Sequence, residues 1–288
     1  RRLLELCGEA AAGGAEIRPQ VAGRPVSLLL GLQTFHPFAY CPSFAPIGAA
    51  SLDEKVRAMR EPEMRARLLA EVDAALASMS QFLDPERAFP MGTVPDYEPA
   101  RADSVAGRAR ALGVPVMEHY YDVLLGEEGR ALVLRPLLNY TDFSLDAVRE
   151  MLLHPTSAWG LGDGGAHCGT NCDASTPTTM LTHWVRDRRR DRLPLEWVVR
   201  KMTAETATMY GLGDRGLLAP GMVGDVNVID DEGLALGRPE FVHDLPGGAR
   251  RFVQRATGYV ATVKSGSVIL ADGADQGERP GRLLRGAR

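Results

Sequence analysis

The residues of this sequence that are best suited to chemistry lie in one glycine-rich segment, from Gly160 to His167. Its carboxylate, Asp163, comes at the end of a short apolar run that predicts a buried strand at 157–162. Glycines on both sides allow the backbone to turn tightly around a ligand. Because catalytic groups in α/β barrels stand at the C-terminal ends of strands, this pattern makes Asp163 a candidate catalytic residue. The alternative interpretation is that Asp163 only forms a turn.

The same segment also satisfies the G-x-G-x-x-G pattern of dinucleotide-binding loops, at Gly160, Gly162 and Gly165. That fingerprint requires a helix that begins at the glycines and points its N-terminus at the pyrophosphate. Here the next predicted helix begins only at Pro177. A nucleotide-dependent oxidoreductase therefore has no support beyond the glycines themselves.

A zinc site is a second alternative for this region, because His167, Cys168 and Cys172 follow closely. Structural zinc normally takes four ligands, often with a C-x-x-C pair. One histidine and a C-x-x-x-C pair supply three ligands at a less common spacing. We interpret the cysteines as buried thiols and His167 as a candidate substrate-binding residue, because it lies on the same loop as Asp163.

Three further candidates for substrate binding follow two other predicted strands. His36 comes after a strand predicted at 26–31, and Asn139 and Tyr140 come after one predicted at 131–138. In a parallel arrangement the carboxyl ends of the strands meet at one rim, where these side chains would lie near Asp163. The basic run 186–192, by contrast, is interrupted by two aspartates and is typical of a solvated helix end.

The predicted elements that position these residues alternate between strand and helix, which indicates a parallel α/β arrangement. Only three such strands are visible, whereas a closed barrel needs eight. Helices are predicted at 53–82, 104–112, 116–125, 144–153, 177–188 and 195–210. After Gly213 the pattern changes to short apolar runs between turns, with a strand at 224–230 and a hairpin at 260–270. We therefore expect two domains, 1–213 and 214–288.

Composition excludes several classes of partner. Lys and Arg number 33 against 37 acidic residues, and the net charge of −4 gives no attraction to nucleic acid. No apolar run approaches the roughly 18–20 residues that span a bilayer, so no membrane partner is expected. The chain begins Arg1-Arg2-Leu3-Leu4, without an initiator Met or the apolar stretch of a signal peptide. We expect a cytoplasmic protein whose natural sequence begins upstream.

Several segments of the second half resemble a known family. The residues 195–203 (LEWVVRKMT), 211–221 (GLGDRGLLAPG) and 224–230 (GDVNVID) are similar to the closing section of amidohydrolases, in a form close to the N-acyl-D-amino-acid deacylase, or D-aminoacylase, branch. The ending at 272–286 is also similar. The resemblance implies a (β/α)8 TIM-type barrel, of which 1–213 would supply the last strands. It also implies a small C-terminal β-sandwich at 214–288 without its N-terminal strands.

The resemblance further implies a role for Asp163 as the aspartate after the eighth barrel strand, which binds metal and accepts a proton from metal-bound water. The cofactor would be a divalent metal, one or two zinc ions, which lowers the pKa of bound water toward about 7. The family's His-x-His and its other ligands have no counterpart in this sequence. They are expected upstream of Arg1, in a missing N-terminal barrel half that acts as the partner of this chain.

The resemblance also bears on the substrate. D-aminoacylase-like enzymes carry His-Pro-Arg shortly after the aspartate, and the arginine holds the substrate carboxylate, whereas this chain continues His167-Cys168-Gly169. The predicted function is a metal-dependent hydrolase of C–N amide bonds in a small-molecule substrate, an N-acyl amino acid or a related amide. The isolated chain is expected to be inactive. The alternative is a non-catalytic relative or assembly subunit that kept the fold and lost the metal.

Overall fold

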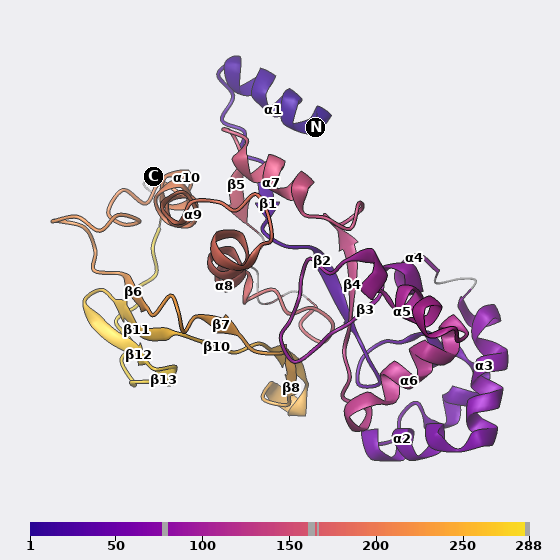
Figure 1. Cartoon of the computed structure of the whole chain (residues 1–288). Coiled ribbons are helices and arrows are strands. Elements are labelled where there is room, and N and C mark those ends of the chain that lie inside the picture. The colour runs from indigo at the N-terminus through magenta and orange to yellow at the C-terminus, as the bar shows by residue number, and fades with distance from the viewer. Residues whose placement is uncertain (77–79, 161–164, 166, 286–288) are drawn as a thin grey trace.

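The computed structural model describes residues 1–76, 80–160, 165 and 167–285 and divides them between helices and short strands (Figure 1). The α-helices are α1 (Arg2–Ala12), α2 (Leu52–Arg60), α3 (Pro62–Leu76), α4 (Ser80–Leu83), α5 (Val105–Leu112), α6 (Val116–Gly129), α7 (Asp146–Leu153), α8 (Thr176–Thr179), α9 (Leu195–Met202) and α10 (Ala204–Met209). A π-helical turn, Met180–Asp187, continues α8. The chain is an α/β protein, as predicted, and α2 to α10 lie close to the predicted helices, whereas α1 was not predicted.

The strands are short and belong to several small sheets. They are β1 (Gln20–Ala22), β2 (Val26–Leu30), β3 (Phe89–Pro90), β4 (Val133–Leu138), β5 (Ala158–Gly160), β6 (Val226–Ile229), β7 (Ala235–Leu236), β8 (Glu240–Val242), β9 (Arg251–Val253), β10 (Ala256–Thr257), β11 (Tyr259–Lys264), β12 (Ser267–Ala271) and β13 (Ala274–Asp275). The predicted strands at 26–31, 131–138 and 157–162 correspond to β2, β4 and β5.

The central sheet has the strand order β2-β4-β3, and both of its pairings are antiparallel. Val26 lies opposite Leu138 and Leu30 opposite Val133. The predicted parallel arrangement is therefore wrong for β2 and β4. An apolar run reports that a strand is buried but not the direction in which it pairs, and the long connection through α2–α6 allows the chain to return either way. The third predicted strand, β5, pairs in parallel with β1 and does not join this sheet.

Both faces of the central sheet are buried, each against a different hydrophobic cluster. Leu29 and its partner Leu134 face one cluster, and Leu30 and its partner Val133 face the other. This alternation follows from the two-residue period of side chains along a strand. Each fully buried Leu or Val contributes about 1.5–3 kcal/mol of transfer free energy. Two-sided burial explains why neighbouring positions, Leu29 with Leu30 and Val133 with Leu134, are both apolar.

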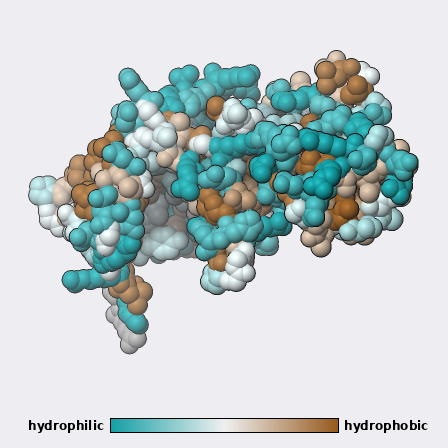
Figure 2. Space-filling model, turned by 90° about the horizontal axis from the view of Figure 1, so that it is seen from below, coloured by the Kyte–Doolittle hydropathy of each residue, from teal (hydrophilic) through white to brown (hydrophobic). Residues whose placement is uncertain are grey.

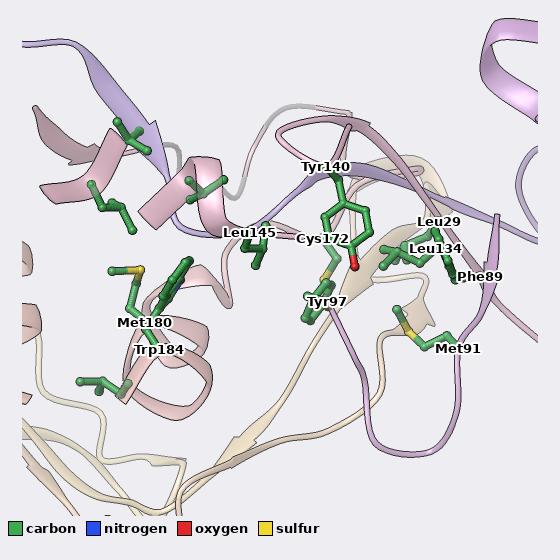
Figure 3. Close-up of a cluster of buried hydrophobic side chains, with 14 of the residues drawn as sticks. Leu29, Phe89, Met91, Tyr97, Leu134, Tyr140, Leu145, Cys172, Met180 and Trp184 are labelled. Atoms are coloured by element: carbon green, nitrogen blue, oxygen red, sulfur yellow. The ribbon is translucent and has the colours of Figure 1, made fainter. Parts of the chain in front are cut away.

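The two clusters draw on different parts of the chain. The cluster around Leu30 is closed mainly by α2, α3, α5 and α6, which lie together beside the sheet in Figure 1. The cluster around Leu29 contains Met180 and Trp184 of the α8 region (Figure 3). It also contains Leu234, which directly precedes β7, and Phe252 of β9, so the C-terminal region shares a core with residues that precede position 214. The domain boundary at 213 stays a prediction.

The C-terminal strands form a four-stranded antiparallel sheet, β13-β12-β11-β6, and two separate strand pairs, β7–β10 and β8–β9. The predicted hairpin at 260–270 is confirmed by the pairing of β11 with β12. Its turn residues, Ser265 and Gly266, have φ angles of 52° and 83°. Positive φ at both central positions is the requirement of the two-residue turns that match strand twist.

The surface is mainly hydrophilic on the face shown in Figure 2, where the hydrophobic areas are separated by hydrophilic ones. Within the described residues, no helix combines the length and apolar character needed to cross a membrane.

The C-terminal end of α6 offers a test of this packing. Gly129 has φ 77°, and a Cβ atom there would lie 2.5 Å from Cγ2 of Val56 in α2. Gly113, which ends α5 with φ 68°, faces open space. We predict that Gly113→Ala costs about 1–2 kcal/mol of unfolding free energy through left-handed strain alone. Gly129→Ala should cost a further ~1–3 kcal/mol through overpacking. Urea denaturation measures both, and equal losses would contradict the α2–α6 contact.

Candidate functional site

The predicted catalytic and metal-binding residue, Asp163, lies outside the described residues, so its role stays a prediction. The structure does describe what precedes and follows it. β5 ends at Gly160, where a Cβ atom would lie 2.8 Å from Oε1 of Gln20. The first glycine of the segment therefore allows β1 to approach closely. The next described residues are Gly165 and the chain from His167 onward.

The loop that follows Asp163 is attached to two strands through its backbone. The carbonyl of Thr170 accepts a hydrogen bond from the amide of Leu29 in β2, at 2.8 Å. The carbonyl of Cys168 accepts one from the amide of Phe252 in β9, at 2.7 Å. His167 is exposed, has φ 49°, and begins a tight turn by accepting hydrogen bonds from the amides of Thr170 and Asn171. The loop therefore has a defined position, with the His167 side chain at the surface.

A buried arginine that sequence reasoning missed holds the end of this loop. Arg24, which is 3% exposed, donates hydrogen bonds to the carbonyl of Cys172 and to Oγ of Ser175 and forms an ion pair with Asp173. Its guanidinium group also lies over the ring of Tyr97, 4.2 Å from the centroid. A buried cation needs such partners, because an unpaired one is strongly destabilising. The only signal in the sequence was a charge directly before a buried strand.

The predicted rim residues do not come together, which corrects the expectation drawn from parallel strands. Asn139 and Tyr140 follow the C-terminal end of β4, which lies beside the start of β2 at Val26. His36 follows the other end of β2. Antiparallel pairing therefore places His36 at the opposite end of the sheet from Asn139 and Tyr140.

The environments of these residues differ from an open rim as well. His36 is 1% exposed and packs edge-on against Phe44 with ring centroids 4.7 Å apart. Burial, aided by the charge of Lys55, lowers the pKa of His36 to about 3, so its ring is neutral near pH 7. Tyr140 is buried in the cluster of Figure 3, and its hydroxyl donates to the carbonyl of Pro99 at 2.6 Å. Asn139 is half-buried with φ 66°. Their substrate-binding roles stay predictions.

A buried charge cluster that the sequence did not predict has Glu98 at its centre. The Glu98 carboxylate accepts hydrogen bonds from Nε and Nη2 of Arg188, both at 3.0 Å, and from the amide of Leu145 at 2.7 Å. Its Oε2 lies 2.9 Å from Nε2 of His183. Burial by itself would raise the pKa of Glu98, but the hydrogen bonds from His183, Arg188 and Leu145 outweigh it and lower the pKa to about 2. Glu98 is therefore ionised at neutral pH.

Arg188 links this cluster to α7, because its Nη2 also donates to Oδ1 of Asp146 at 2.6 Å. The side chain of Arg188 is only 2% exposed. The interpretation of the run 186–192 as a solvated helix end is therefore wrong at this position. Charge spacing could not reveal it, since the partner Glu98 lies 90 residues away in the sequence.

No metal centre is formed by the described residues alone. Among them, no three His, Cys, Asp or Glu side chains come together in a way that could hold an ion. The predicted ligand Asp163 lies outside this set, so its part in a metal site is not tested.

Comparison with known proteins identifies one matching family. The sequence pattern that defines the amidohydrolase family matches residues 10–270 of this chain. No curated protein matches it.

Three solved structures are similar to the chain. One is a D-aminoacylase, at 23% identity over 73% of this chain and 44% of that one, with a TM-score of 0.38. Another is a D-aminoacylase studied for its binuclear metal centre, at 24% identity over the same shares, with a TM-score of 0.39. The third is a D-aminoacylase mutant in complex with copper chloride, at 22% identity over 69% of this chain and 37% of that one, with a TM-score of 0.39. This chain spans less than half the length of each, and such TM-scores transfer no site geometry to it.

The charge cluster predicts a specific pH dependence of stability. The pKa of Glu98 is about 2 in the folded chain, against an ordinary value of 4.5. A lowered pKa contributes stability that is complete above about 4.5 and is lost as the pH falls toward 2, on the order of 3 kcal/mol. Glu98→Gln should therefore unfold more easily at neutral pH and lose less further stability between pH 4.5 and 2.

Chemical denaturation at a series of pH values measures this slope. Glu278→Gln is the matched control, because Glu278 is exposed and its side chain forms no hydrogen bond or ion pair with another described residue. The control should keep the acid-dependent loss of the unchanged protein. An unchanged slope in Glu98→Gln would show that the buried cluster does not govern the acid response.

Proposed function

Because this chain belongs to the amidohydrolase family, we propose that it is part of a metal-dependent hydrolase of C–N amide bonds in small molecules. The observation that carries the proposal is the family match over residues 10–270, which includes the segment around Asp163. The segments 195–203 and 224–230 support the D-aminoacylase-like branch of the family.

We assign the proton transfers of the reaction to Asp163. When water attacks the amide carbon, the carboxylate accepts the water proton and delivers it to the leaving amine. The surroundings of the segment support this role. β5 leads into it, and the loop that follows is held to β2 through Thr170 and to β9 through Cys168. The described residues before and after Asp163 are therefore held by strands, and such anchoring suits acid–base catalysis, which requires a positioned group.

A divalent metal, one or two zinc ions, belongs to this proposal. When bound, such an ion polarises the amide carbonyl and lowers the pKa of water. The described residues do not by themselves fit a metal, since no suitable group of three ligands occurs among them. We therefore infer that Asp163 acts together with ligands supplied from outside this sequence, by an N-terminal half of the barrel that is the partner of this chain.

The barrel part of the proposal is confined to β1 and β5, because they pair in parallel. β2 and β4 pair in antiparallel fashion, whereas all neighbouring strands of a (β/α)8 barrel are parallel. For the C-terminal strands we propose an incomplete β-sandwich, supported by the four-stranded sheet β13-β12-β11-β6.

The proposed substrate is an N-acyl amino acid or a related amide. The loop after Asp163 continues His167-Cys168-Gly169 and has no arginine at the position where D-aminoacylase-like enzymes hold a substrate carboxylate. A panel of amides with and without a carboxylate therefore decides the substrate class. We expect turnover of uncharged amides to be comparable to that of N-acyl-D-amino acids.

The central test replaces Asp163 in the complete, zinc-loaded protein. Asp163→Asn keeps the size of the side chain but cannot accept a proton, so turnover should fall by the roughly 10²–10⁴-fold typical of losing acid–base catalysis. KM should change less, because the loss falls mainly on the transition state. Steady-state amide hydrolysis measures both constants.

Asp73→Asn provides the matched control, because Asp73 is exposed on α3. It should leave turnover unchanged. Near-normal turnover in Asp163→Asn would support the turn-forming interpretation of this residue, since Asn forms tight turns as readily as Asp. Absence of hydrolysis in the complete protein with bound zinc would favour a non-catalytic subunit.

The chain of 288 residues alone provides an independent test. A catalytic zinc ion normally needs about three protein ligands. We predict that the isolated chain, supplied with zinc, hydrolyses no amide above the background rate. Metal-dependent hydrolysis by the isolated chain would contradict the proposal that the remaining ligands lie outside it.

A further inference from the structure

The charge cluster around Glu98 borders a cavity of about 620 Å³. This volume is within the range of roughly 300–1,000 Å³ that is usual for small-molecule sites. Its walls come from the loop 94–100, from Phe143 and Ser144, from the π-helical turn and from β7. Of the described residues predicted to bind substrate, none lines it.

Most charges in the wall of this cavity are already paired. Arg188 is bound to Glu98 and Asp146, Arg190 to Asp146, and Arg186 to Asp187. Arg189 also lines the cavity and is exposed, and its side chain has no recorded hydrogen bond or ion pair to any described residue. It is thus a cation available to a ligand.

None of the acidic side chains that line the cavity forms an ion pair with Arg189. Glu98 forms an ion pair with Arg188, and Asp187 forms one with Arg186. Asp96 is exposed and accepts a hydrogen bond from the amide of Glu98 at 2.8 Å. His183 adds a ring that Glu98 holds through Nε2, while no described residue is recorded as bonding to Nδ1. Arg189 and this ring nitrogen are two polar groups of the wall that a ligand can contact.

Apolar residues also line the cavity, and one of them is a strained aromatic residue. Phe143 has φ 55°, which is a genuine outlier for a bulky side chain. Its ring is held by the guanidinium of Arg87 at 4.9 Å and of Arg101 at 5.3 Å. Leu236 and Val94 extend the apolar surface, and Val94 is 79% exposed. Strained residues that the surroundings hold in place are concentrated at ligand sites.

We propose that this cavity binds a small organic carboxylate that carries an apolar group about the size of one ring. The carboxylate pairs with Arg189 beside His183, and the apolar group packs against Phe143 and Leu236. A cation without a protein partner and several apolar side chains in the wall of one cavity match the two parts of such a molecule. This binding site is proposed in addition to the amide hydrolysis.

Titration calorimetry of the full chain with phenylacetate, and with the neutral phenylacetamide, tests the proposal. Phenylacetate should bind one-to-one and about 5-fold more tightly than phenylacetamide, the gain from a partly exposed ion pair. Arg189→Met should remove this difference and leave the affinity for phenylacetamide unchanged. Arg57→Met, at an exposed arginine of α2, is the matched control and should bind as the unchanged chain does.

A second variant keeps Arg189 and fills the cavity. Ala235 lines it from an exposed position on β7, so Ala235→Trp can occupy the space without disturbing the core. This variant should lose the binding of both compounds while keeping its unfolding midpoint. The proposal is overturned if neither compound binds the unchanged chain at millimolar concentration, if Arg189→Met binds phenylacetate normally, or if Ala235→Trp does so.

Discussion

Burial of both faces of the β2–β4 pair is the constraint on which the rest of the structure depends. Leu29 and Leu134 meet one hydrophobic cluster, and Leu30 and Val133 meet the other. Two-sided burial requires covering elements on each side. The helices α2, α3, α5 and α6 cover one face, and the α8 region with parts of the C-terminal strands covers the other. The core therefore joins segments from both ends of the chain.

The loop that follows Asp163 derives its position from the same sheet. The amide of Leu29 binds the carbonyl of Thr170, and Arg24, just before β2, binds the carbonyl of Cys172. Trp184 adds a hydrogen bond to the carbonyl of Gly23 at 2.6 Å. The hydrophobic pairing of β2 thus fixes a polar loop, because the edges and ends of a buried strand must satisfy their backbone groups.

Electrostatic compensation is the second organising feature. Arg188 is buried and Glu98 is partly buried, and Glu98 accepts hydrogen bonds from Arg188 and the amide of Leu145 and lies within hydrogen-bond distance of His183. The cluster connects the loop 94–100 with α7 and the π-helical turn. Arg188 and Arg190, which line the adjacent cavity, are paired in or next to this cluster, whereas Arg189 has no ion pair with a described residue.

The sequence by itself determined the family, the positions of the three buried strands β2, β4 and β5, most helices and the hairpin at 260–270, but not β1 or β3. These features depend on local patterns, because period, turn residues and family segments are each contained in a few neighbouring positions. Sequence also singled out Asp163, and the chemistry proposed for it rests on the family resemblance rather than on any contact in the described residues.

Only the tertiary structure decided the direction of strand pairing, the burial of His36 and the partners of Arg188. Apolar periodicity records which faces of a strand are buried, and both parallel and antiparallel neighbours satisfy it equally. The contact between Glu98 and Arg188 joins residues 90 positions apart, so neither local charge pattern contains it. Such pairs exist because folding brings distant segments to one buried place, where an ion without its partner would be too unfavourable to remain.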